Sequence, residues 1–391
     1  MKGFVLSPGA QMVFTLLRQA GFATYLVGGA VRDILMDRTV DDFDLATAAL
    51  PEQVITAVRG LEVIPTGIKH GTVTVRALGE SIEVTTMRCD TTYSDGRHPD
   101  SVDFTGDIVQ DLARRDLTVN AMAWGPEGLC DPFDGQGDVR RQLLRCVGDA
   151  AVRFEEDGLR LLRVLRFAAQ LGFAVEAKTD AALRAGFGRM ECVAAERTRV
   201  ELEKLLCGPK VVRVLRGYWP QIAQLVPELC PDYPDVLTAA FAQLRPIMAQ
   251  RWAGLLIAGY CDHEAIAHLK LSNRELARIE HAIGAYFGVK GTTLSLKQSV
   301  RRHGNQAVED ALALQAAFGL DAPVELYRDI VQRHECCTLA QLAVTGNDLA
   351  ALGLQGPAVG AMLEGLLERV MTGELPNQTQ ALLNAAKEMK A

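Results

Sequence analysis

The sequence predicts an α+β domain at the N-terminal end, followed by a region that is almost entirely helical. Short apolar runs typical of strands occur before residue 138: TYLV, DFDLA, TVTVRAL, SIEVTTM and the weaker TVNAMAW. After about residue 140 they nearly vanish, and a 3.6-residue period appears in GLRLLRVLRFAAQLG, RTRVELEKLL, RELARIEHAIGAYF and AVGAMLEGLLERVMTG. A first amphipathic helix precedes the strands. The segments CGPK, PDYPD and VKGTT predict breaks between later helices.

The composition is that of an ordinary globular enzyme with more than one domain. The chain has 391 residues, of which 49% are hydrophobic and 23% charged, and no apolar run approaches the ~18 residues that span a bilayer. With no small-residue cleavage site near the start, the sequence predicts a cytoplasmic protein with no membrane partner. Nine cysteines without a C-x-x-C pair predict neither zinc nor a disulfide scaffold.

The charge distribution is more informative than the net charge of −7, which alone argues against a general nucleic-acid binder. Between Arg140 and Arg166 there are seven arginines against four acids. This basic stripe is either a solvated helix face or a functional surface.

Asp42 and Asp44 stand two apart on a predicted strand, so both carboxylates should point to the same face. Two carboxylates suit Mg²⁺, which takes its other ligands from water and substrate phosphate. Gly28 and Gly29, between a strand and a helix start, would let backbone N–H groups approach a triphosphate. A common turn and a common strand end are the alternative. Glu83 is the candidate third acid, unless it is a solvent residue of an edge strand.

A second constellation lies in RFEEDGLRLLRVLRF, where the spacing places Asp157 and Arg160 side by side on a helix surface. An aspartate accepts from the amino group of cytosine or adenine, while an arginine donates to the neighbouring ring nitrogen. Uracil and guanine present the opposite polarity and would leave buried groups unpaired. The pair therefore predicts selection of C and A, and Arg163 and Arg166 continue the row. An ion-paired helix face is the alternative.

Taken together, these segments resemble the class II tRNA nucleotidyltransferase and bacterial poly(A) polymerase superfamily. The similarity runs in order through GGAVRDILMDRTVDDFDLAT, TGIKHGTVTV, EVTTMR, RRDLTVNAMA, DPFDGQGDV, RFEEDGLRLLRVLRFAAQLGF and ERTRVELEKLL, and includes the C-terminal LAVTGNDLAALGLQGPAVGAMLEGLLERVMTGELPN. It implies a polymerase β-like nucleotidyltransferase head (1–138), a helical neck with the nucleotide-base template (139–207), a helical body (208–295) and a helical, tRNA-binding tail (296–391).

The resemblance also implies roles for individual residues. It makes Asp42 and Asp44 the metal-binding catalytic acids, and Asp157 with Arg160 the base template. Two departures from the usual pattern, Asp134 and Met36–Asp37 where glycine is frequent, bear on loop flexibility. The remaining assignments are the phosphate cradle (Gly28, Gly29, Arg32, Asp33), the incoming nucleotide (Arg115, Asp116, Asn120) and a brace for the template helix (Glu196, Arg199).

Within this superfamily the sequence favours complete CCA addition to the tRNA 3′ end from CTP and ATP with Mg²⁺. Members that add only CC lack a flexible loop after the Glu83 strand, whereas RCDTTYSDGRHPDSVDF is intact here. TGIKHGTVTV resembles tRNA-processing members more than tailing polymerases. A-only addition, poly(A) tailing and a tRNA-binding protein with a vestigial site stay open as alternatives. A small-molecule nucleotidyltransferase would not need the long helical region.

Overall fold

The computed structural model describes residues 5–40, 42–68, 71–90, 102–230 and 232–390. The chain divides into two compact units, Met1–Val214 and Leu215–Ala391. The predicted boundaries at residues 138, 207 and 295 divide the chain more finely and stay predictions. Residues 91–101, most of the RCDTTYSDGRHPDSVDF loop that bears on CC-only addition, and residues 69–70 of TGIKHGTVTV lie outside the described residues.

The first unit is built on a seven-stranded mixed sheet in the order β3-β4-β5-β2-β1-β8-β9. β2 and β5 are parallel neighbours, and the other neighbouring strands are antiparallel. The sheet and the helices around it confirm the predicted α+β class. The strands are β1 (Thr24–Val27), β2 (Asp44–Thr47), β3 (Glu62–Gly67), β4 (Thr72–Ala77), β5 (Glu80–Thr86), β8 (Ala123–Gly125) and β9 (Gly128–Cys130).

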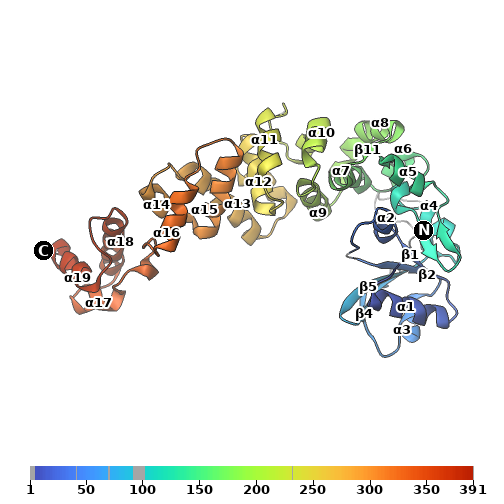
Figure 1. Ribbon diagram of the computed structural model, residues 1–391, viewed down its shortest axis with the longest axis horizontal. Helices are drawn as coiled ribbons and strands as arrows, with labels where there is room; N and C mark the ends of the chain where they lie inside the picture. The colour runs from blue at the N-terminus through green and yellow to red at the C-terminus, as the bar shows by residue number, and fades with distance from the viewer. Residues whose placement is uncertain (1–4, 41, 69–70, 91–101, 231, 391) are drawn as a thin grey trace. The chain divides into compact units, whose positions relative to one another are not determined.

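Helices cover this sheet because each has an apolar face. α1 (Pro8–Gln19) starts at the N-cap Ser7, whose hydroxyl accepts from the Ala10 N–H. Its buried Val13 and Leu17 lie on the side that packs against β4 and β5, and α3 (Pro51–Ala57) lies beside it (Figure 1). The other elements of this region are α2 (Gly29–Leu35), β6 (Arg88–Asp90), β7 (Val102–Phe104), α4 (Ile108–Ala113), η2 (Thr118–Asn120) and α5 (Gly135–Arg141).

The rest of the first unit is helical, as predicted, with one exception. β10 (Leu143–Leu144) and β11 (Ala174–Val175) form a two-residue parallel pair that the sequence pattern did not indicate. α7 (Leu159–Leu171) is largely buried, ends at the left-handed Gly172 and packs against α9 (Ala195–Leu206). The remaining elements are α6 (Ala150–Glu156), α8 (Ala177–Gly186) and η3 (Phe187–Cys192).

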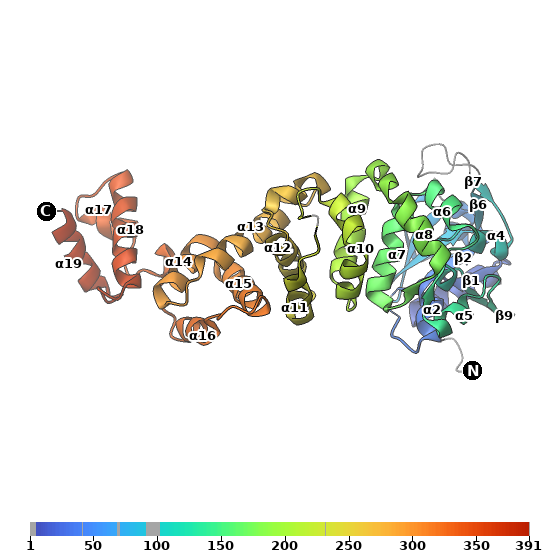
Figure 2. The same ribbon diagram turned by 90° about the horizontal axis from the view of Figure 1, so that it is seen from above.

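The second unit is helical in its described residues (Figure 2), and two of the predicted breaks, PDYPD and VKGTT, separate α10 from α11 and α13 from α14. The third, CGPK, separates α9 from α10. Its cores include one cluster around Leu296, Val308 and Ile330, and another around Leu349, Leu366 and Leu382. No helix in the described part of the chain has the length and apolarity needed to cross a membrane. The elements are α10 (Val211–Leu225, shared with the first unit), α11 (Asp235–Gln243), α12 (Met248–Ala258), η4 (His263–Leu269), α13 (Asn273–Gly288), α14 (Thr293–His303), α15 (Asn305–Ala317), α16 (Val324–Gln332), η5 (Leu339–Gln341), α17 (Gly346–Ala351), α18 (Pro357–Met371) and α19 (Thr379–Lys390).

Candidate active site

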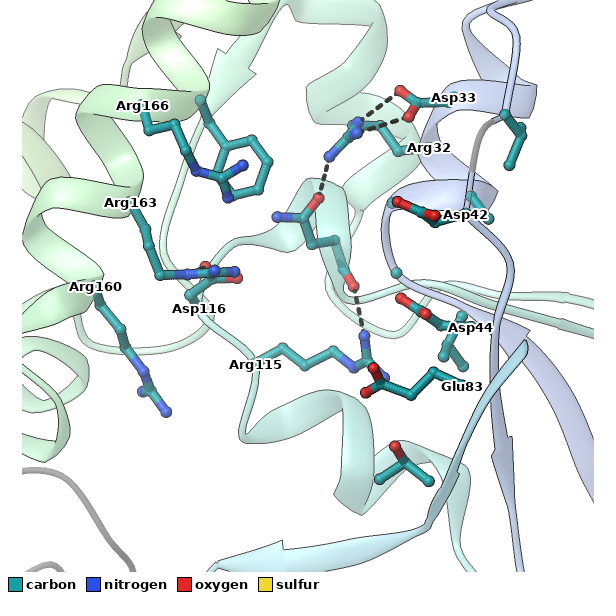
Figure 3. A pocket seen from close by; sticks show the side chains of 18 of the residues that line it. Arg32, Asp33, Asp42, Asp44, Glu83, Arg115, Asp116, Arg160, Arg163 and Arg166 are labelled. Carbon is teal, nitrogen blue, oxygen red and sulfur yellow. Dashed lines mark hydrogen bonds and ion pairs between the residues drawn. The ribbon is translucent and has the colours of Figure 1, made fainter. Parts of the chain in front are cut away.

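A cavity of about 600 Å³ lies within the first unit, between the sheet and α7. Its acids come from strands, from a helix and from connecting segments, and helices contribute most of its arginines. The structure thus brings every predicted catalytic and nucleotide-binding residue into the lining of one cavity (Figure 3). These residues are Gly28, Gly29, Arg32, Asp33, Asp42, Asp44, Glu83, Arg115, Asp116, Asn120, Asp157, Arg160, Arg163 and Arg166.

The acids come from two strands and a connecting segment. Asp44 is the first residue of β2 and is in register with Glu83 on the parallel β5. Because β5 lies inside the sheet, the alternative of an edge-strand residue for Glu83 is wrong. The expectation that Asp42 also lies on the strand is wrong too: Asp42 precedes β2. Both aspartates nevertheless turn into the cavity (Figure 3).

The electrostatics of Asp44 reflect burial beside other carboxylates. Burial, followed by the neighbouring carboxylates of Glu83 and Asp42, raises the pKa of Asp44 to about 6, while Arg115 acts in the opposite direction. Carboxylates crowded together in this way favour a bound cation, which would remove their repulsion. Among the described residues no group of three or more acids, histidines or cysteines is arranged around a metal position, so a closed protein cage is not the geometry here.

The turn between β1 and α2 brings the backbone to the edge of the cavity. Val27 pairs with Asp44 across the sheet, so the next residue, Gly28, begins its turn beside the acids. Gly28 has φ 71° and ψ −133°, a conformation open to glycine but strained for other residues. A Cβ atom at Gly28 would lie 3.0 Å from Arg115 Nη1. The turn therefore requires glycine at this position.

Two side chains from the RRDLTVN segment offer unused hydrogen-bond donors to the cavity. Arg115 donates through Nη1 to the Asn120 carbonyl at 3.4 Å and pairs through Nη2 with the buried Asp111 at 3.2 Å. Asn120 Oδ1 accepts from Arg32 Nη1 at 2.6 Å. Within the described residues Arg115 Nε and Asn120 Nδ2 are buried without a partner. Unpaired buried donors that line a cavity indicate a polar ligand.

The predicted Asp157 and Arg160 pair is arranged differently from the expectation. α6 ends at Glu156 and α7 begins at Leu159, so the two residues do not lie side by side on one continuous helix. Asp157 has extended backbone, and its Oδ1 accepts from the Leu159 N–H at 3.0 Å. Asp157 ends α6 and Gly158 is the N-cap of α7, and the Asp157 carboxylate satisfies the first backbone N–H of α7.

Each member of that pair also contacts another residue. Asp157 forms an ion pair with Arg197 of α9 at 2.7 Å. Arg160 pairs with Glu156 at 2.5 Å and donates to the Arg114 carbonyl at 3.0 Å. Asp157 and Arg160 are therefore not paired with each other, but each is ion-paired with another residue, so the alternative of an ion-paired face stays open. Both side chains still line the cavity, where a base could exchange these contacts for its own.

The arginines of α7 are held by carboxylates from outside their own helix. Arg163 Nε lies 2.7 Å from Asp116 Oδ2, and Arg166 Nε lies 2.5 Å from Glu201 Oε2. Although burial opposes ionisation, Arg163 and Arg160 hold the pKa of Asp116 at about 2, below its ordinary 3.8. The guanidinium groups are thus fixed as cations along one wall of the cavity.

Sequence reasoning missed two residues of α9 that contact the cavity's charged groups, Arg197 and Glu201. It singled out Glu196 and Arg199 instead, and Arg199 lies 3.5 Å from Glu203 on its own helix. The bracing role of those two residues stays a prediction. The R-x-x-x-E spacing of Arg197 and Glu201, which places both on one helix face, was the available signal. Phe167 and Arg114 also line the cavity and were not singled out.

The mixed sheet, the paired acids and the arginine wall define a nucleotidyltransferase. Residues 24–145 match the family described as "Poly A polymerase head domain", 172–230 the family described as "Probable RNA and SrmB-binding site of polymerase A", and 248–386 the family described as "tRNA nucleotidyltransferase domain 2 putative". The CCA-adding enzyme of Leuconostoc citreum is 47% identical over 403 residues, covering 97% of this chain and 96% of that protein. The chain belongs to the CCA-adding, class II tRNA nucleotidyltransferases.

Other relatives agree with this assignment. The CCA-adding enzyme of Limosilactobacillus fermentum is 34% identical over 391 residues, covering 97% of this chain and 96% of that one. The Bacillus stearothermophilus CCA-adding enzyme in complex with CTP has a TM-score of 0.83 at 31% identity, with 98% of each chain covered. The Thermotoga maritima CCA-adding enzyme complexed with tRNA, at 19% identity and a TM-score of 0.68 over 98% of this chain and 95% of that one, shares the fold.

Proposed function

We propose that the cavity binds CTP or ATP and that its residues transfer CMP or AMP to the 3′ end of tRNA, completing the CCA sequence. Membership of the CCA-adding family supports the reaction, and the cavity supports the location. The observation that carries the proposal is the meeting of a carboxylate pair, Asp42 and Asp44, with the arginine wall of α7 (Arg160, Arg163 and Arg166) and with the unpaired buried donors of Arg115 and Asn120. A nucleoside triphosphate has the charge and the acceptors that such a wall requires.

Asp42 and Asp44 are proposed to hold the divalent metal that this family uses, and Mg²⁺ is the proposed ion. The residues fit it: burial, followed by repulsion from Glu83 and Asp42, raises the pKa of Asp44, a bound cation would offset both effects, and two open carboxylates leave room for phosphate and water ligands. When bound, Mg²⁺ would neutralise phosphate charge and favour ionisation of the attacking hydroxyl. Glu83, in register with Asp44, would support this charge arrangement.

The residues of this chain would bind and orient the nucleotide. Gly28 and Gly29 let the triphosphate approach the backbone, and the arginine wall holds its oxygens. Asn120 Nδ2 and Arg115 Nε donate their free hydrogens to it, which satisfies groups now unpaired. The remaining proposed phosphate and positioning contacts are Arg32, Asp33, Asp116, Arg163 and Arg166.

Base selection is proposed to rest on Asp157 and Arg160, as the sequence predicted, but by exchange of partners. The amino group of C or A would take one carboxylate oxygen of Asp157 from Arg197. Arg160 would give up its bond to Glu156 or to the Arg114 carbonyl and donate to the ring nitrogen. U and G, whose polarity is reversed, would not replace the hydrogen bonds that the two side chains give up.

We also propose a cytoplasmic location. All nine cysteines are free thiols in the structure, and several of them are buried. A chain with many unpaired cysteines is typical of a reducing compartment.

Replacement of Asp42 or Asp44 by asparagine tests the proposed site directly. We expect a loss of nucleotide addition of at least about a hundredfold, the usual scale for removing a group that stabilises the transition state. Affinity for tRNA should change little. The substrates are tRNA transcripts ending before, after one and after two C residues, each given CTP, ATP or both with Mg²⁺.

The matched control is Glu62→Gln, which removes an exposed carboxylate from β3 of the same sheet and should leave addition unchanged. An Asp44→Asn variant with near wild-type rate would contradict the assignment of the acids. The same transcripts distinguish the remaining activities, because A-only addition would extend only transcripts that already carry both C residues, and poly(A) tailing would continue past one A.

A further inference from the structure

Three guanidinium groups converge on one aromatic ring at the cavity wall. The Arg166 Cζ lies 3.8 Å from the centroid of the Phe167 ring, Arg32 Cζ lies 5.4 Å from it, and Arg163 Cζ lies 5.5 Å from it. All three distances are within the ~6 Å at which a cation is attracted to an aromatic face. Phe167 itself lines the cavity and is almost fully buried.

These cations come from different parts of the unit. Arg163 and Arg166 belong to α7, whereas Arg32 belongs to α2, beside the glycine turn. Arg32 pairs with Asp33 and Arg163 with Asp116, whereas Glu201 lies near both Arg166 and Arg163, at 2.5 and 3.6 Å. All three guanidinium groups contact the Phe167 ring.

The cluster has an electrostatic cost. Burial lowers the pKa of Arg166, and the charges of Arg163 and Arg32 lower it further, while Glu201 acts in the opposite direction. The negative face of a phenyl ring attracts each cation and offers no hydrogen-bond acceptor that would use up an N–H donor. A ring in this place therefore gathers the charges and leaves donors available to a ligand.

We propose that Phe167 is a positioning residue that sets the three guanidinium groups at the spacing needed to hold the triphosphate. The proposal rests on the proposed function, in which these arginines bind phosphate oxygens. Through Arg32 on one side and Arg163 with Arg166 on the other, the ring joins the glycine turn of the sheet region to the basic row of α7. An aliphatic residue of similar volume would fill the same space without attracting the cations.

Fluorination of the Phe167 ring distinguishes an electrostatic role from a packing role. If the ring acts through its negative face, nucleotide binding should weaken with each added fluorine, whereas a packing role predicts little change. Site-specific replacement of Phe167 by mono-, di- and trifluorophenylalanine weakens the negative face in steps while nearly preserving shape. We expect the KM for both CTP and ATP to rise in the same steps, reaching about tenfold for trifluorophenylalanine and for Phe167→Leu. The kcat should change less, and the preference for C and A over U should not change.

The matched control is the same fluorinated series at Phe173, a buried phenylalanine of the same unit that does not line the cavity. Thermal unfolding of every variant monitors the fold. If KM does not follow fluorination at Phe167, or follows it equally at Phe173, the proposal is overturned.

Arg163→Ala and Arg166→Ala separate this proposal from the proposed function. If these variants raise the KM for CTP and ATP but fluorination at Phe167 does not, the arginine wall binds phosphate and Phe167 is only packing. If the arginine variants also leave KM unchanged, the placement of the triphosphate on this wall is wrong. Stepwise increases at Phe167 together with increases in both arginine variants support both proposals.

Discussion

At the scale of single residues, base selection is proposed to rest on a few side chains, and Asp157 is the one proposed to face the amino group of C or A. Replacing it with alanine removes that acceptor and leaves Arg197 without its carboxylate partner. We expect the activation free energy for incorporation of both C and A to rise by on the order of 1–3 kcal/mol, so both rates fall. Discrimination against U and G should weaken. Single-turnover incorporation of all four nucleotides on a tRNA lacking its last residue measures this.

Glu155→Ala is the control for that change. Glu155 is two residues away, but its carboxylate pairs with Arg189 at an exposed position outside the cavity lining. The Glu155→Ala variant should leave the base preference unchanged. By contrast, Arg160→Ala should remove the hydrogen bond donated to the ring nitrogen of C or A. If Asp157→Ala keeps the wild-type preference for ATP over UTP and GTP, base selection lies elsewhere in the first unit.

Asp116 makes a specific prediction for stability in acid. Its pKa is about 2 in the folded chain and 3.8 as an ordinary carboxyl group, so its ion pair stabilises the fold fully above about pH 4. This contribution, about 2 kcal/mol in all, is lost as the pH falls from about 4 to 2, and about 1 kcal/mol of it is lost by pH 3. Urea unfolding at pH 5 and pH 3 measures the difference.

Asp116→Asn provides the comparison, because an amide does not titrate. The variant should be less stable at pH 5, but its free energy of unfolding should fall by about 1 kcal/mol less than that of the wild type between pH 5 and pH 3. Equal losses in the two proteins would show that the Asp116–Arg163 pair does not carry this pH dependence.

At the scale of elements, the turn between β1 and α2 fixes the backbone beside the acids. Gly28→Ala places a side chain in a conformation that costs about 1–3 kcal/mol and within 3.0 Å of Arg115 Nη1. We expect lower thermal stability together with a higher KM for nucleotide. Gly21→Ala has a similar positive φ but open space around it, so it should lower stability without changing KM. A raised KM in both variants would mean that KM responds to a general loss of stability and not to the conformation of the β1–α2 turn.

The elements that the sequence predicted well are those with a strong local signal. β4 and β5 alternate apolar and polar residues, and α13 starts with the capping box of Ser272 and Glu275. β3 escaped prediction because its residues show no regular alternation of burial and it contains Pro65. The paired β10 and β11 are two residues each, which is too short for any periodicity.

The residues of the candidate site also differ in whether the local sequence could identify them. Its acids and glycines could be recognised because they lie close together in sequence, whereas the Asp157–Arg197 pair joins residues 40 positions apart through packing of α7 on α9. The interruption at Asp157–Gly158 had a local signal that was overlooked: an aspartate and a glycine before an apolar periodic run commonly begin a helix. Asp37 and Asp134, which replace frequent glycines, both adopt positive φ, and aspartate tolerates that conformation better than most residues.

For the whole molecule, the question is how a chain with a net charge of −7 binds a polyanion. The net charge by itself would repel tRNA. Favourable contacts must therefore come from local groups of arginine and lysine whose charges act on nearby phosphates, because ions screen interactions beyond about 10 Å at 0.1 M salt. Binding of this kind releases counterions from the RNA.

We therefore expect tRNA affinity to fall steeply with salt in spite of the acidic composition. A plot of log affinity against log KCl concentration should be linear, with a slope of about −0.7 to −0.9 for each phosphate that is neutralised. Fluorescence anisotropy of a labelled tRNA between about 50 and 300 mM KCl measures it, and the Asp44→Asn variant prevents nucleotide addition during the titration. The variant and the wild type should share one slope, because Asp44 is assigned to chemistry and not to tRNA contacts. A flat plot would show that local basic groups do not drive binding, and different slopes would place Asp44 among the groups that set tRNA affinity.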